Sequence, residues 1–141
     1  MKKLVVDASV MIKWVAGDPA EPDQHRAMTL LQAWMNCEVE LMAPVLWQYE
    51  VGNFLGRRLP QEAEEKLALL LNLGITGFNL TPAMCRRCFT WMRDRAITFY
   101  DAAYLAAAVE TGGLLVTADE KFTQRMADVG SIGLLSRIAL D

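Results

Sequence analysis

The stretch KLVVDASVMIKWVA (residues 3–16) places an acidic residue between an apolar strand and an amphipathic helix. The apolar, valine-rich run before Asp7 predicts a buried strand over residues 3–6. Beyond it the large apolar side chains recur at helical spacing, so residues 9–16 are predicted to form a helix. Asp7 therefore stands at the carboxyl end of a predicted strand, which is where open α/β sheets bind their ligands.

The rest of the chain continues this alternation of strands and helices. Further strands are predicted at residues 39–43, 78–80, 114–117 and 130–134, and further helices at residues 22–37, 45–59, 60–74, 82–95, 98–111 and 120–128. Strands separated by helices imply crossover connections and a parallel sheet with helices on both faces. With 141 residues and no internal repeat or long linker, the chain is predicted to form one α/β domain over residues 1–141.

Composition and charge narrow the class of protein. The longest apolar run, residues 102–109, is much shorter than the about 20 residues that a bilayer-spanning helix needs. The apolar N-terminal stretch ends at Asp7, well short of the roughly 7–15 apolar residues of a signal peptide. We therefore expect a cytoplasmic protein that does not bind membranes. The net charge of −3 argues at first against a nucleic-acid partner, although local basic patches matter more than the total.

Cysteine and histidine chemistry is not indicated. The three cysteines are an odd number, and Cys85 and Cys88 lie one turn apart inside a predicted helix, where small buried side chains are the simpler interpretation. His25 is the only histidine, so neither a zinc site nor a histidine acid–base pair is expected.

Four acidic residues stand in contexts that set them apart from ordinary surface carboxylates. They are Asp7 in VVDAS, Glu50 in YEVGN, Asp101 in FYDAAYLAAA and Asp119 in LLVTADEKF. Burying an unpaired carboxylate is costly, whereas a divalent cation with oxygen ligands lets like charges share one site. The pattern therefore indicates Mg²⁺ or Mn²⁺ and metal-assisted cleavage of a phosphodiester.

Each acid also has an ordinary structural explanation. Asp7 could cap the following helix. The segments TFYD (residues 98–101) and TADE (residues 117–120) resemble capping boxes, with Asp119 as a turn residue in the second. Glu50 could pair with a nearby arginine. Capping does not explain why Glu50 interrupts the apolar side of its helix, nor why acids follow both of the strongest predicted strands.

The blocks VVDASVMIKW, YEVGNFL, ITFYDAAYLAAA and LLVTADEKF, in this order, resemble the PIN-domain ribonucleases, and most closely the VapC-type toxins of toxin–antitoxin pairs. The resemblance extends from Lys3 to about Leu134. It implies a PIN-like (Rossmann-like) parallel sheet and an endoribonuclease whose water is activated by Mg²⁺ or Mn²⁺. It also implies a cognate antitoxin and a homodimer. Carried over by position, Asp7, Glu50, Asp101 and Asp119 are the metal-binding and catalytic acids, and Ser9, Asn53 and Thr117 support them.

The RNA must also be held by cations, and three side chains are candidates. Lys13 lies one turn beyond Ser9, and Arg57 and Arg58 lie two turns beyond Glu50. The wide apolar faces of the helices between residues 22 and 73 are the expected antitoxin groove.

Three other functions stay open at this point. The chain could be an RNA-processing PIN nuclease without an antitoxin, or a metal-free binding module on a degenerate PIN fold. A small nucleotide- or phosphate-binding regulator would share the fold class. Receiver domains also place acids at strand ends, but the lysine that they require on a late strand is not found in this sequence.

Overall fold

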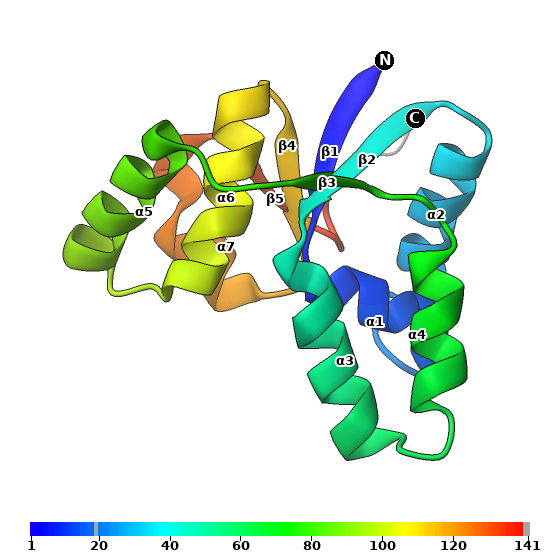
Figure 1. Ribbon diagram of the computed structural model, residues 1–141. Helices are drawn as coiled ribbons and strands as arrows, with labels where there is room; N and C mark the ends of the chain where they lie inside the picture. Colours follow the sequence, from blue (N-terminus) through cyan, green and yellow to red (C-terminus); the bar gives the residue numbers. More distant parts are fainter. Residues whose placement is uncertain (19, 140–141) are drawn as a thin grey trace.

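The arrangement of strands puts the first strand at the centre of the sheet. The structure, a computed structural model, describes residues 1–18 and 20–139. Its strands pair in parallel in the order β3-β2-β1-β4-β5 (Figure 1). They are β1 (Lys2–Val6), β2 (Val39–Pro44), β3 (Thr76–Phe78), β4 (Leu114–Thr117) and β5 (Ile132–Leu134). The strand order reverses between β1 and β4, so their carboxyl ends form the position at which such sheets bind ligands.

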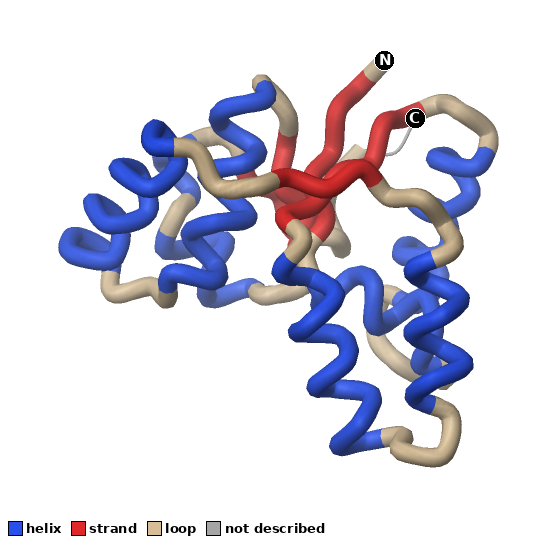
Figure 2. The backbone as a smooth tube through the Cα atoms, in the orientation of Figure 1, coloured by secondary structure: helices blue, strands red, loops and turns tan. Residues whose placement is uncertain are grey.

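Helices cover both faces of this sheet, as predicted. They are α1 (Ala8–Ala16), α2 (Gln24–Met35), α3 (Leu46–Arg58), α4 (Ala63–Leu71), α5 (Pro82–Arg95), α6 (Phe99–Thr111) and α7 (Glu120–Arg125), followed by the short 3-10 helix η1 (Ala127–Val129). Figure 1 shows α1, α2 and α4 on one side of the sheet and α5, α6 and α7 on the other. Figure 2 shows that α3 and α4 extend beyond the carboxyl edge of the strands, so α3 lies beside that edge. None of the helices in the described residues is long and apolar enough to cross a membrane.

The core lies where α6 packs against the central strands. The side chains of residues 102–108 in α6 are all buried, and five of them are alanines. Small side chains let the helix approach the sheet closely, and α6 contacts β1, β2 and β4. The turn between α6 and β4 is close to β1 as well, because a Cβ atom on Gly113 would lie 2.9 Å from the carbonyl oxygen of Lys3.

Several predicted boundaries were wrong. The strand predicted at residues 78–80 lies at Thr76–Phe78, where Gly77 pairs with Ala43 of β2. A Cβ atom on Gly77 would lie 2.9 Å from the Val45 side chain, so the packing of this side chain against the strand explains a glycine that the sequence pattern did not assign to a strand. The helix predicted at 120–128 ends at Arg125, and a separate 3-10 turn follows it.

Two glycines provide a matched test of this packing. Gly113→Ala should destabilise the protein by about 1–3 kcal/mol, because the added methyl group meets the backbone of β1. Gly56→Ala should stabilise it by about 1 kcal/mol, because Gly56 lies inside α3 with nothing within 4 Å of the added atom. Urea unfolding of both variants measures the difference. Equal effects of the two substitutions would show that the turn before β4 does not approach β1 as described.

Candidate active site

Asp7 lies at the junction of β1 and α1 and is only 8% exposed. Its Oδ1 atom accepts hydrogen bonds from the backbone nitrogens of Ser9 (3.1 Å) and Val10 (3.4 Å), so Asp7 does cap α1. The Ser9 hydroxyl donates to the same oxygen at 2.5 Å. These bonds hold the carboxyl group at the carboxyl edge of the sheet.

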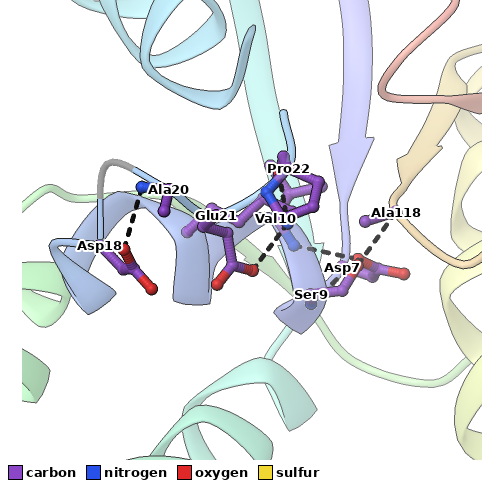
Figure 3. A network of polar contacts seen from close by, with 9 residues as sticks. Asp7, Ser9, Val10, Asp18, Ala20, Glu21, Pro22 and Ala118 are labelled. Carbon is purple, nitrogen blue, oxygen red and sulfur yellow. Dashed lines mark hydrogen bonds and ion pairs between the residues drawn. The ribbon is translucent and has the colours of Figure 1, made fainter. Parts of the chain in front are cut away.

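Ser9 also connects the ends of the two central strands. Its hydroxyl oxygen accepts a hydrogen bond from the backbone nitrogen of Ala118, which follows β4, at 3.1 Å. Figure 3 shows Asp7, Ser9 and Ala118 together at this edge. The predicted supporting residue Ser9 therefore joins the first acid to the segment that carries the last one.

Asp119 begins α7, two residues after β4 ends. Its Oδ1 atom accepts from the backbone nitrogen of Phe122 at 3.0 Å, and its own backbone nitrogen donates to the Thr117 hydroxyl at 3.1 Å. The predicted capping box from Thr117 to Glu120 is therefore wrong, because the N-cap residue is Asp119 itself. Thr117 is fully buried and supports the turn that presents Asp119.

Asp101 lies in the first turn of α6 and is half-buried. The Thr98 hydroxyl accepts from the backbone nitrogen of Asp101 at 3.1 Å, so the threonine of the predicted capping box does cap the helix. The negative charge of Asp101 lies at the N-terminal end of the helix dipole, where a carboxylate is favoured.

Glu50 in the middle of α3 is held by a residue of another helix. The hydroxyl of Tyr104, which is 2% exposed, donates to Glu50 Oε1 at 2.7 Å. No salt bridge to Glu50 is present in the described parts of the chain, so the predicted pairing with an arginine is not found. The sequence interpretation missed Tyr104. Its spacing of three residues from Asp101, on the same side of α6, was the signal that could have identified it.

The environment of Asp7 opposes its negative charge. Burial raises the pKa of Asp7 to about 6, although hydrogen bonds with the Ser9 and Thr117 hydroxyls act in the opposite direction. The negative charge of Asp101 contributes to the increase. Asp7 thus binds its proton more tightly than an ordinary aspartate does.

The other acids are linked through Asp101. Burial raises the pKa of Glu50, the Tyr104 hydrogen bond offsets part of the increase, and the charge of Asp101 adds to it. Burial also raises the pKa of Asp101, and the charge of Asp119 adds to that increase. The charge of Asp101 therefore raises the pKa of both Asp7 and Glu50, and the charge of Asp119 raises the pKa of Asp101.

The predicted RNA contacts lie in two different environments. Lys13 is buried and donates to Glu21 Oε1 and to the Pro22 carbonyl oxygen, both at 2.8 Å. The structure thus assigns Lys13 to the segment between α1 and α2, which corrects the idea that it points toward the acids. Arg57 and Arg58 are exposed at the end of α3 and share a surface hollow with Glu50.

The four acids have the right chemistry for a divalent cation, but their side chains are not arranged closely enough to hold one. Residues 1–18 and 20–139 contain no group of three His, Cys, Asp or Glu side chains arranged closely enough to hold a metal ion. The donors are nevertheless hard carboxylate oxygens, and none of the ion pairs in these same residues involves them. Asp7, Glu50, Asp101 and Asp119 are therefore the residues whose chemistry fits such a cation.

Comparisons with known proteins agree with this fold. A toxin–antitoxin complex from Klebsiella pneumoniae shares 18% identity and a TM-score of 0.68, covering 96% of this chain and 99% of that chain. VapBC-1 from nontypeable Haemophilus influenzae shares 13% identity and a TM-score of 0.67, with coverage of 96% and 99%. VapC20 from Mycobacterium tuberculosis, described as a sarcin–ricin loop cleaving toxin, shares 18% identity and a TM-score of 0.63, with coverage of 86% and 93%. No curated protein matches the chain.

The family is shown by a direct match to the sequence. The family model described as the PIN domain matches residues 4–127, a range that includes all four acids and the whole of β2, β3 and β4. This protein therefore belongs to the PIN domain family.

Proposed function

We propose that this protein is a metal-dependent endoribonuclease and the toxin of a type II toxin–antitoxin module. The main support is that four acids from distant parts of the sequence lie along the carboxyl edge of the sheet. None of them forms an ion pair within residues 1–18 and 20–139. Membership of the PIN domain family and the fold shared with solved toxins support the same conclusion.

The proposed metal ligands are Asp7, Glu50, Asp101 and Asp119. A bound Mg²⁺ or Mn²⁺ would offset their mutual repulsion, stabilise the charge that develops on the phosphodiester and make water a better nucleophile at neutral pH. The hydrogen bonds from Ser9 and from the backbone of Val10 to Asp7 reach its Oδ1 atom, and the backbone bond from Phe122 likewise reaches Oδ1 of Asp119.

The protein's own residues orient these acids. Ser9 holds Asp7 through a short hydrogen bond, and Tyr104 holds Glu50. Tyr104 is buried, so its hydroxyl is a fixed donor that favours the charged form of Glu50. Asn53 is exposed beside Glu50 and could contact the RNA or a water molecule from there.

The toxin assignment depends on a partner. Exposed apolar side chains lie on α2 and α4, and they are Met28 (41% exposed), Met35 (62%), Leu69 (58%) and Leu71 (48%). An antitoxin segment that covers this surface would remove apolar area from water.

The alternative function, an RNA-processing nuclease, predicts no such inhibitor. Purification from the native host distinguishes them, since a toxin should copurify with a small protein whose proteolysis restores RNA cleavage.

Asp7→Asn tests the proposed chemistry. The amide keeps the shape and the helix cap but removes one anionic ligand, so Mg²⁺-dependent RNA cleavage should fall by at least about a hundredfold. The control is Glu64→Gln, which removes one charge from an exposed position in α4 and should cleave like the wild type. Cleavage of labelled RNA by each purified protein is the measurement. Wild-type activity in Asp7→Asn would exclude the proposed site.

The raised pKa of Asp7 predicts how stability depends on pH. Because the folded pKa is about 6 against an ordinary 3.8, the native state binds this proton more tightly than the unfolded state, and the group's contribution to stability falls as pH rises across that interval. Above pH 6 the charge costs about 3 kcal/mol. Metal-free Asp7→Asn should therefore melt above the wild type at pH 7.5, and the difference should shrink toward pH 4.

Added Mn²⁺ completes this test. A cation that binds only the native protein should raise the melting temperature of the wild type more than that of Asp7→Asn. Calorimetry in chelator and in Mn²⁺ measures both effects. If metal-free Asp7→Asn melted well below the wild type at pH 7.5, the capping role of Asp7 would outweigh the cost of its charge.

A further inference from the structure

Two surface hollows adjoin the acids, and each contains both carboxylates and cations. The first, which we call the α3 hollow, is lined by Glu50, Asn53, Phe54, Arg57 and Arg58. The second, the α7 hollow, is lined by Ala96, Ile97, Thr98, Asp101, Asp119, Lys121, Phe122 and Arg125. The four acids are thus divided between a hollow on α3, a hollow on α7 and the buried position of Asp7.

The cations in both hollows lack acidic partners. In the described part of the chain, the basic side chains that form ion pairs are Lys13, Lys66, Arg87, Arg93 and Arg95. Lys121 and Arg125 share a hollow with Asp101 and Asp119, yet neither pairs with them. Their charges therefore remain available to an anion from outside the protein.

Arg125 is also held in place by neutral contacts. Its Nη1 atom donates to the carbonyl oxygen of Ala96 at 3.0 Å, in the turn between α5 and α6. Its own carbonyl oxygen accepts from Arg95 at 3.1 Å, and Arg95 forms two hydrogen bonds with Asp128 at 2.6 and 2.7 Å. Arg125 is therefore held in the lining of the α7 hollow by an uncharged partner. Its positive charge is not neutralised by that contact, as binding of a phosphate requires.

The two hollows contain different acids, because Glu50 lines the α3 hollow and Asp101 and Asp119 line the α7 hollow. The charge of Asp101 contributes to the raised pKa of Glu50, and the charge of Asp119 contributes to that of Asp101, so the acids of the two hollows are near enough to repel each other. Arg57 and Arg58 share the first hollow with Glu50, and Lys121 and Arg125 share the second with Asp101 and Asp119. A polyanion that extends from one hollow to the other would meet a pair of cations in each, which would offset its repulsion by the carboxylates.

We propose that Lys121 and Arg125 bind a backbone phosphate of single-stranded RNA that adjoins the cleaved phosphate, while Arg57 and Arg58 bind a phosphate on the other side. This inference rests on the proposed function and names its substrate as an extended single strand. Asp7 is buried and Asp101 half-buried, and α3 extends past the carboxyl edge beside them. A flexible strand can enter such a recessed edge, whereas a rigid duplex is recognised across its exposed groove.

The test measures how binding of RNA depends on salt. The full chain is titrated with a fluorescein-labelled, mixed-sequence RNA of 12 nucleotides, with Ca²⁺ in place of Mg²⁺ and the RNA checked for integrity on a gel. Each lost phosphate contact should reduce the slope of log affinity against log salt by about 0.7. The variants are Lys121→Ala/Arg125→Ala and Arg57→Ala/Arg58→Ala. The control is Arg86→Ala/Arg137→Ala, which removes the same charge from exposed positions outside both hollows.

The inference predicts that both test variants bind several-fold more weakly, with reduced slopes, and that the control behaves like the wild type. A blunt duplex of the same sequence should not distinguish Lys121→Ala/Arg125→Ala from the control. If this variant folds poorly, the single variants Lys121→Ala and Arg125→Lys are used. The slope of log affinity against log salt is then expected to fall only in Lys121→Ala.

A Lys121→Ala/Arg125→Ala variant that matches the control, while the wild type binds and cleaves RNA, overturns the inference alone. A wild type that neither binds nor cleaves RNA overturns the proposed function.

Discussion

Electrostatic repulsion at the carboxyl edge of the sheet is the constraint around which this structure is organised. Asp7, Glu50, Asp101 and Asp119 come from four segments that the parallel topology brings to one edge. Burial and mutual repulsion raise the pKa of the first three, and none of the four has a basic partner among the described residues. A protein that needed these residues only as caps would gain stability by neutralising them or exposing them to water.

The polar residues around the acids limit the cost of this arrangement without removing it. Ser9 and Tyr104 each donate to a carboxylate, and these bonds also connect β1 with the segment after β4 and α3 with α6. The same contacts that support the acids therefore hold neighbouring elements together. Stability and function are opposed at this edge, because the charges that cost folding free energy are those that a cation and an RNA strand would use.

The sequence predicted the fold well where the pattern depends on local physics. The valine-rich β1 and the apolar β4 were located to within one residue, and the alternation of strands and helices gave the parallel sheet. The edge strand β3 was misplaced, because Gly77 is explained only by contact with Val45. Asp7 and Asp119 both cap helices, and this capping does not exclude the metal-binding role that is proposed for them. The contact of Lys13 could not be predicted from the sequence, because its partner Glu21 lies in an irregular segment. The role of Tyr104 was missed because its partner, Glu50, lies on another helix.

The central claim is that the acids interact as one group, and the pKa of Asp101 tests it most directly. Carboxyl carbon NMR of the metal-free protein can follow the titration of Asp101 in the wild type, in Asp119→Asn and in Asp94→Asn, a control at an exposed acid that lies outside the site. The account predicts a raised pKa of Asp101 in the wild type, a lower value in Asp119→Asn and no change in Asp94→Asn. An Asp101 pKa that is the same in all three proteins would contradict it, because the acids would then be independent helix-end residues.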